Sequence, residues 1–289
     1  MALHSHWMPT GAPTPQNPAV ALRYRASVSE LTDAQLAELR AAFADMQATA
    51  DDRGYQYWAG IHGLPLPAWC DKYGHGKPTF LHWHRAYLYQ FELKLRAAGH
   101  GHDVMLPWWD WLNVPEIPSA YAVTENPAGA PNPLHSVRIN DVALQQGARG
   151  AIPGDPGEIE LARQPDTVRH EGLPGTQLPT RADIDQVLAY SDFQSFTANL
   201  EDWHGQVHVW VGGHMSDIPF AAYDPIFWAH HTMIDRIWRI WQLRYPDAAS
   251  LPATLDSEVM EPFGLSAGRT LDVTTLGYDY ASATTSINL

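Results

Sequence analysis

The stretch that decides the fold runs from Trp203 to Arg236 and reads WHGQVHVWVGGHMSDIPFAAYDPIFWAHHTMIDR. It places His204 four residues before His208, and His231 four residues before Asp235. Positions i and i+4 lie on one face of a helix with their Cβ atoms about 6 Å apart, so two such imidazoles can bind one metal ion. We expect the Asp235 carboxylate to accept a hydrogen bond from a metal-binding His231 ring and thereby fix its tautomer.

Two helices are predicted in and around this stretch, at about 198–212 and 225–244. Asp224 is a typical N-cap residue, and Pro225 suits the first helical position because an N–H there would have no partner within the helix. The pattern therefore predicts that the second helix carries His231 back to meet the first.

The remaining helices are predicted from apolar residues that recur every three or four positions. Thr32 and Gln35 resemble a capping box at the start of a helix over 33–48. Further helices are expected over 52–62, from Phe80 to a stop at Gly99, and, as a short one, over 181–190.

Irregular segments are expected to make up most of the rest. Residues 112–180 are rich in proline and glycine and lack periodicity, so we expect surface loops, some of them rimming the site. The tail, 250–289, reads as loop with short strands, and 1–20 reads as an extended arm. The predicted fold is mainly α: a four-helix bundle core with long irregular loops and a few short strands, in a single domain over 1–289.

Composition excludes several classes of function. The chain has 289 residues, of which 45% are hydrophobic, enough for a sizeable core. Its formal net charge of −14 argues against nucleic acid or an anionic membrane as a partner. The single cysteine, Cys70, excludes an intrachain disulfide. The N-terminal residues resemble neither a signal peptide nor a membrane span, so we expect a cytoplasmic protein.

Each half of the chain supplies three candidate metal ligands. The two sets are His62, His75 and His84, and His204, His208 and His231. Neutral imidazoles suit copper in both oxidation states. A zinc hydrolase is the competing interpretation, but no Asp or Glu is among the candidate ligands to bridge two ions, and a general-base motif such as HExxH is missing. The pattern favours a copper pair that is bridged by a small molecule from outside.

These residues carry a specific resemblance. The segment GHGKPTFLHWHRAYLYQFE, residues 74–92, resembles the first copper-binding motif of the type 3 copper proteins, which are tyrosinases, catechol oxidases and hemocyanins. HGQVHVWVGGHM and YDPIFWAHHTMIDRIW resemble the second motif. In that family the third ligand is the latter histidine of the adjacent pair, which implies His231 rather than His230. The match is dense over 58–111 and 198–244.

The resemblance implies two copper ions per chain, one on each set of histidines, with O2 as co-substrate. The implied activity is oxidation of o-diphenols or o-aminophenols to quinones, with reduction of O2 to water and with ortho-hydroxylation of monophenols left open. A hemocyanin-like reversible O2 carrier is the alternative. Apart from a small phenol and O2, the resemblance suggests a copper-delivery (caddie) protein as a partner, as some bacterial relatives have.

Glu201 and Gly205 bear on the choice of substrate. In tyrosinases a Glu near this point and an Asn directly after the first ligand of the second set are thought to hold a water that deprotonates monophenols. Glu201 matches the Glu, but Gly205 stands at the Asn position and cannot orient that water. The resemblance therefore implies that diphenol oxidation is favoured over monophenol hydroxylation.

Further side chains are candidates for supporting the site. Asp235 is expected to support a ligand histidine or, alternatively, to form an ion pair with an arginine of its own helix, and Glu92 is a second candidate for the supporting role. We expect His214 to form hydrogen bonds rather than to bind metal. Ile218 resembles the substrate-pocket wall near the second copper, and Phe227 is a candidate for the same pocket, although packing around the imidazoles is favoured.

Two features outside the copper motifs also resemble the family. Arg25 resembles an N-terminal arginine that packs on a Tyr-x-Tyr motif closing the catalytic domain, and Tyr278 to Tyr280 fits that motif. We expect a short form that lacks the C-terminal shielding domain of many relatives. Relatives with a Cys–His thioether have cysteine where Tyr73 stands here, so Cys70 is expected to be a free thiol.

Overall fold

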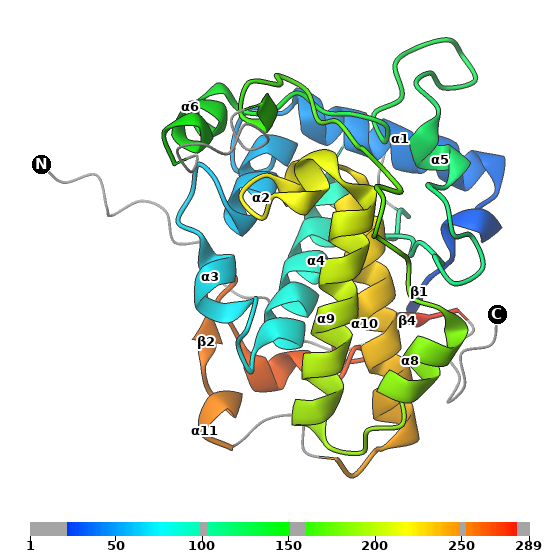
Figure 1. The fold of residues 1–289 in the computed structure, drawn as a ribbon, viewed down its shortest axis with the longest axis vertical. Helices are drawn as coiled ribbons and strands as arrows, with labels where there is room; N and C mark the ends of the chain where they lie inside the picture. The colour runs from blue at the N-terminus through cyan, green and yellow to red at the C-terminus, as the bar shows by residue number, and fades with distance from the viewer. Residues whose placement is uncertain (1–21, 99–102, 151–159, 249–252, 282–289) are drawn as a thin grey trace, which may run out of the picture.

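The computed structural model describes residues 22–98, 103–150, 160–248 and 253–281, and the predicted arm over 1–20 lies outside these ranges. The described chain is mainly helical, with a few short strands (Figure 1). Its helices are α1 (Asp33–Ala48), α2 (Tyr55–His62), α3 (Trp69–Tyr73), α4 (Phe80–Ala97), α5 (Ser119–Ala122), α6 (Asp141–Gly150), α8 (Arg181–Val187), α9 (Phe193–Val211), α10 (Ile226–Arg244) and α11 (Ala253–Asp256). Its strands are β1 (Arg23–Arg25), β2 (Val259–Met260), β3 (Leu265–Ser266) and β4 (Tyr278–Tyr280), and short 3₁₀ turns span Val28–Glu30, Gly213–Ser216, Ala221–Tyr223 and Ala267–Thr270.

Helices α4, α9 and α10 run side by side through the centre, and α2 lies across one end of them (Figure 1). Aromatic side chains fill the space between these helices. The rings of Phe91 on α4 and Trp228 on α10 stack with centroids 3.5 Å apart, and Tyr55 at the start of α2 packs edge-on against both. This aromatic packing holds the helices that carry the candidate ligands against one another, in agreement with the predicted helical core.

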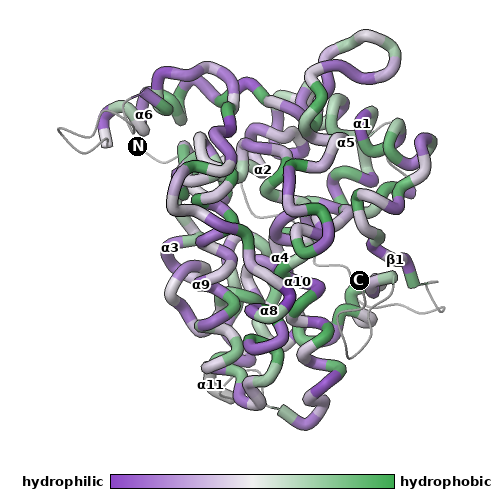
Figure 2. Tube along the Cα trace, turned by 45° about the vertical axis from the view of Figure 1, so that its right-hand side comes forward, coloured by the Kyte–Doolittle hydropathy of each residue, from purple (hydrophilic) through white to green (hydrophobic). Residues whose placement is uncertain are grey.

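Helix α1 covers this core, and its amphipathic pattern was correctly predicted. Its bounds agree with the predicted helix over 33–48, and the capping box is present: the Gln35 N–H donates to Thr32 Oγ1 at 3.3 Å, and the Thr32 N–H donates to Gln35 Oε1 at 2.9 Å. In Figure 2 hydrophobic and hydrophilic residues alternate along α1. Phe43 faces inward and packs against Tyr55 and Phe91.

Three predicted helix starts shift for local reasons. Helix α2 begins at Tyr55 because residues 51–54 form a turn, closed by a hydrogen bond from the Gly54 N–H to the Asp51 carbonyl. Helix α9 begins at Phe193, earlier than predicted, because the Asp192 carboxylate caps it. Helix α10 begins at Ile226, whose N–H donates to Asp224 Oδ1 at 3.1 Å, so the Asp-Pro start is correct to within one residue.

The expectation of loops alone over 112–180 was wrong. This segment contains α5 and α6, and α3 was also missed. Helix α6 starts where the Asn140 side chain accepts hydrogen bonds from the N–H groups of Val142 and Ala143. It buries only Ala143, and Gly147 together with the prolines and glycines around the helix made the segment resemble a loop in the sequence.

The two ends of the described chain meet in a small parallel sheet. Strand β1 pairs with β4, with Arg25 opposite Tyr280, while β2 and β3 form a separate antiparallel pair. The Arg25 guanidinium lies over the Tyr278 ring at 3.8 Å, so the predicted contact between this arginine and the Tyr-x-Tyr motif is confirmed. Among the described helices, none combines the length and the apolar character that crossing a bilayer requires.

Candidate metal centre

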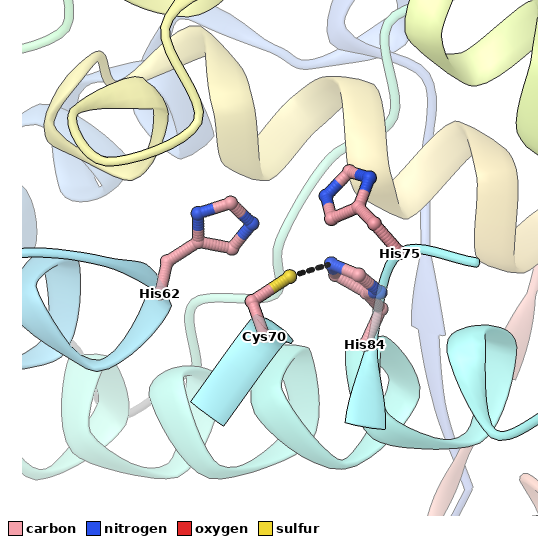
Figure 3. Close-up of side chains that lie close together, drawn as sticks. All are labelled: His62, Cys70, His75 and His84. Atoms are coloured by element: carbon pink, nitrogen blue, oxygen red, sulfur yellow. Dashed lines mark hydrogen bonds between the residues drawn. The ribbon is translucent and has the colours of Figure 1, made fainter. Parts of the chain in front are cut away.

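Three histidines of the first half converge in one cluster. His62 ends α2, His75 lies in the turn before α4, and His84 lies in the first turns of α4. Their ligand-capable nitrogens and the Cys70 sulfur all lie within 4.8 Å of one another. Figure 3 shows the three imidazoles and the thiol turned toward a common point.

Backbone carbonyls orient two of these rings. His62 Nδ1–H donates to the Ile218 carbonyl at 3.0 Å, and His84 Nδ1–H donates to the Phe80 carbonyl at 2.9 Å. A carbonyl oxygen only accepts, so each ring must carry its proton on Nδ1 and present the Nε2 lone pair to the cluster. The buried Nε2 atoms of His62 and His75 have no hydrogen-bond partner, as expected of atoms that await a metal ion.

The second cluster joins α9 to α10. His231 Nε2 lies 3.2 Å from His204 Nε2 and 3.1 Å from His208 Nε2. Nitrogens at these separations can both lie about 2.0–2.1 Å from one ion, at an N–metal–N angle of about 100°. His208 Nδ1–H donates to the Met215 carbonyl at 2.7 Å, which fixes this ring as His62 and His84 are fixed.

Burial keeps the imidazoles in the form that binds metal. It lowers the pKa of His208 to about 3 and drives the pKa values of the other buried cluster histidines below their ordinary value. Neighbouring imidazoles lower the pKa of most of them further, because a charge on one ring disfavours a charge on the next. A metal ion therefore meets neutral ligands without first displacing protons.

The two clusters are in direct contact through their imidazole rings. The rings of His84 and His231 stack with centroids 4.5 Å apart, and those of His75 and His204 are 5.1 Å apart. Phe227 closes one side, with its ring 4.0 Å from His231. The two groups fit a pair of copper ions held close to each other by neutral nitrogen donors.

Asp235 and Glu92 do not support the histidines, which corrects the sequence-based expectation. Asp235 Oδ1 accepts from Arg85 Nε at 2.5 Å, and its Oδ2 accepts from Arg25 at 3.2 Å and from Tyr278 Oη at 2.8 Å. Glu92 accepts from Arg25 at 2.9 Å and from a backbone N–H. The expected ion pair with an arginine of the same helix is also wrong, because the arginines that bind Asp235 lie on other elements.

The loop over 213–220 supplies the carbonyls of Met215 and Ile218 that orient the rings. His214 anchors it with hydrogen bonds rather than as a ligand, as predicted: it accepts from the Val168 N–H at 3.0 Å, and its Nε2–H donates to the Leu161 carbonyl at 3.1 Å. Both hydrogen bonds of His214 go to backbone groups and none to a histidine of the clusters.

Ile218 and Phe227 have different surroundings. The Ile218 side chain is 45% exposed and lines a cavity of about 860 Å³ whose described lining residues include none of the six predicted ligands. Its role as a substrate-pocket wall stays a prediction. Phe227 is fully buried and packs on the imidazoles, so its placement in the substrate pocket is corrected and its packing role is confirmed.

Glu201 and Gly205 lie on α9 near the open side of the clusters. Glu201 Oε1 accepts from the Gly76 N–H at 2.6 Å and lies 3.9 Å from His75 Nδ1. Burial raises the pKa of Glu201, while the Gly76 hydrogen bond partly opposes that rise. A Cβ built on Gly205 would have no neighbouring atom within 4 Å, so a side chain at this position starts in open space.

Two ligand-capable side chains near the clusters were not predicted. The Cys70 sulfur lies 3.8 Å from His84 Nε2, and His230 belongs to the second cluster, although the resemblance implies only His231 of the adjacent pair as a ligand. Gly74 makes room for the first arrangement, because a Cβ there would lie 2.5 Å from Cys70 Sγ. The adjacent-histidine pattern was visible in the sequence, but it does not say how far a second ring turns inward.

Comparison with known proteins agrees with this geometry. The family model of the common central domain of tyrosinase matches residues 52–244. The tyrosinase of Streptomyces antibioticus is 35% identical over 198 residues, which cover 63% of this chain and 69% of the relative. Hemocyanin 1 of Megathura crenulata is 31% identical over 266 residues, which cover 83% of this chain but 7% of that much longer protein.

Solved structures show the same fold. A functional unit of octopus hemocyanin superimposes with a TM-score of 0.71 at 29% identity, covering 90% of this chain and 68% of the other. A copper-bound mutant of active Aspergillus oryzae tyrosinase superimposes with a TM-score of 0.70, covering 96% of this chain and 95% of the other. At 22% identity, the second comparison speaks for the fold alone.

Proposed function

Because the chain belongs to the tyrosinase family of type 3 copper proteins, we propose that it is a dicopper phenol oxidase. In this proposal His62, His75 and His84 bind one copper ion, and His204, His208 and His231 bind the other. The substrates are O2 and an o-diphenol or o-aminophenol, and the products are a quinone or its imine and water.

The observation that carries this proposal is the open side of the first cluster. The His75 side chain is 25% exposed and the neighbouring Glu201 side chain is 19% exposed, whereas His62 and His84 are almost fully buried. A ligand ring that reaches the surface of the described chain gives access to molecules larger than O2. An oxidase needs such access, and an oxygen carrier does not.

The chain's own residues have three tasks in this reaction. When bound, the copper pair would pass electrons from the phenol to O2, two from each of two diphenols, so that one O2 is reduced to two molecules of water. The carbonyls of Met215 and Ile218 and the ring of Phe227 hold the imidazoles and keep water from their inner side. Glu201, whose pKa is raised by burial, accepts the phenolic proton through its oxygen that is not bonded to the Gly76 N–H.

We propose that diphenols are preferred because glycine occupies position 205. No side chain at this place can fix a water next to His204, and in this proposal a monophenol passes its proton to Glu201 through such a water, whereas a diphenol does not depend on it. The open space at the Cβ position of Gly205 supports replacement of this glycine by asparagine as a test.

A hemocyanin-like oxygen carrier is the second candidate. It is favoured by the length of the match to hemocyanin 1, which covers 83% of this chain compared with 63% for the Streptomyces antibioticus tyrosinase. Both functions use the same ligands, so metal content cannot separate them.

The test is turnover. Copper-loaded protein is mixed with catechol, DOPA, o-aminophenol, tyramine or tyrosine, and oxygen uptake is followed together with quinone absorbance. We expect continuous uptake with the diphenols, and a lag or low rate with the monophenols. Metal-free and zinc-loaded protein serve as controls. Reversible oxygen binding without catechol turnover would establish the carrier instead.

A further inference from the structure

His230 is the buried histidine that the proposed copper ligation leaves without a task. Its side chain is fully buried, and neither ring nitrogen has a hydrogen-bond partner at normal distance, although the backbone of His204 lies close enough to oppose the lowering of its pKa by burial. The ring packs against all three predicted ligands of the second cluster, 5.3 Å from His204 in a near-parallel stack, 4.9 Å from His208 and 5.3 Å from His231.

An imidazole in this place is physically costly unless its nitrogens find a partner. Burial of a polar atom without a hydrogen bond costs free energy, whereas a phenyl ring would fill similar space without that cost. A ligand-capable atom of His230 lies within 4.8 Å of those of the other three histidines. His208 already donates its N–H to the Met215 carbonyl, so the three remaining N–H groups cannot serve the lone pairs of all four rings, whereas a metal ion can accept from each of them.

His231 is a ring that could give way to His230. No hydrogen bond holds its Nδ1, which is true of His204 as well, whereas the Nδ1–H of His208 is bonded to the Met215 carbonyl. His230 is its neighbour on α10, so a rotation of the two side chains could exchange one nitrogen for the other without moving the helix backbone. The exchange keeps His204 and His208 in place.

We propose that His230 is a reserve ligand of the second copper ion, which coordinates it whenever His231 is displaced, as during loading or release of the metal. This inference rests on the copper centre of the proposed function. The ligand chemistry is that of a neutral imidazole donor, and the occupied site then contains His204, His208 and His230.

The test compares copper content in wild type, His230→Phe, His231→Ala and the double variant. Each protein is loaded with a copper salt and desalted, its copper is measured by elemental analysis, and its fold is checked by circular dichroism. We expect about two copper ions per chain in the wild type and in both single variants, and about one in the double variant. Loss of the second ion from His231→Ala, or its retention in the double variant, would overturn the proposal. Its loss from His230→Phe alone would do so too, because His230 would then be a required ligand.

A second measurement does not depend on the folding of the double variant. A chelator is added to copper-loaded wild type and to His230→Phe, and the release of each ion is followed. Without the reserve ligand, the second ion should leave several-fold faster, while release of the first ion is unchanged. Equal rates would contradict the role of His230. A wild-type chain that binds two copper ions but oxidises no phenol would defeat the proposed oxidase while leaving this inference intact.

Discussion

Replacement of Asp235 by asparagine separates the two roles that this residue could have. The sequence suggests that Asp235 orients His231, whereas the structure places its carboxylate among Arg25, Arg85 and the hydroxyls of Tyr278 and Tyr280. Asp235→Asn keeps the shape of the side chain and removes its charge. The structure therefore predicts loss of stability with little change in copper binding.

The magnitude follows from the charges of this buried group. Arg25 and Arg85 are balanced by Glu92 and Asp235, and all four side chains are at most 3% exposed. The variant leaves one buried positive charge without a counter-charge, which typically costs about 3–5 kcal/mol. Each kcal/mol shifts the melting temperature of a domain of comparable size by about 2–4 °C, so we expect a drop of roughly 10 °C.

The pH dependence has a definite sign. Burial acts to raise the pKa of Asp235, but Arg85 and Arg25 outweigh burial and hold it below its ordinary value. A lowered carboxyl pKa stabilises the fold above the unfolded-state pKa of about 3.9, and this contribution is lost as the pH falls through the folded-state value. The difference between wild type and variant should therefore be complete at neutral pH and shrink in acid.

The assay is urea and thermal unfolding of metal-free protein, together with copper titration. Asp279→Asn is the matched control, because Asp279 lies on β4 and pairs with Arg239 at 2.8 Å but is 18% exposed. We expect the control to lose no more than about 1 kcal/mol. The reasoning would be refuted if Asp235→Asn unfolded like wild type but bound copper about 10–100-fold more weakly, the usual effect of losing a group that orients a ligand.

Four further predictions test other parts of the site. Gly205→Asn should raise the ratio of monophenol to diphenol activity several-fold, and an unchanged ratio in copper-loaded protein would count against the water-site interpretation. Burial lowers the pKa of His82 and His208 to about 3, so metal-free protein should lose about 1.4 kcal/mol of unfolding free energy per histidine and pH unit below about pH 6.5; urea titrations at pH 7 and pH 5 measure this. Cys70 should react as one free thiol after denaturation, and a tryptic peptide joining it to a histidine would contradict that. Gly213→Ala should weaken copper binding, because Gly213 has φ +54° and an added Cβ would lie 2.0 Å from a backbone carbonyl of the neighbouring segment; copper titration with circular dichroism as the folding control decides it.

The helices could be predicted where the chain has a local period. The bounds of α1 agree with its apolar pattern and capping box, and α10 begins within a residue of the Asp-Pro signal. Helices α3 and α6 were missed because α3 has only five residues, and because α6 contains Gly147 and lies in a segment rich in proline and glycine. Local patterns therefore indicated the helices that build the core and failed for those at its edge.

The candidate site divides in a similar way. His204 and His208 could be paired from spacing, because i,i+4 positions share a helix face whatever surrounds the helix, and the other four histidines could be grouped from the motifs that resemble the family. The long-range partners of the buried polar groups could not be predicted. The carbonyl that orients His62 belongs to Ile218, which is 156 residues away in the chain. The Asp235 carboxylate binds Arg25, which is 210 residues away.

The sequence by itself determined which residue types are available and on which helix faces they lie. Only the tertiary structure decided that Asp235 serves the junction of the chain ends, that backbone carbonyls fix the imidazoles, and that His230 and Cys70 join the clusters. The physical reason is the distance along the chain over which each effect acts. Helix periodicity arises from neighbours within a few residues, whereas the partner of a buried polar group depends on how distant elements pack, and that depends on the whole core at once.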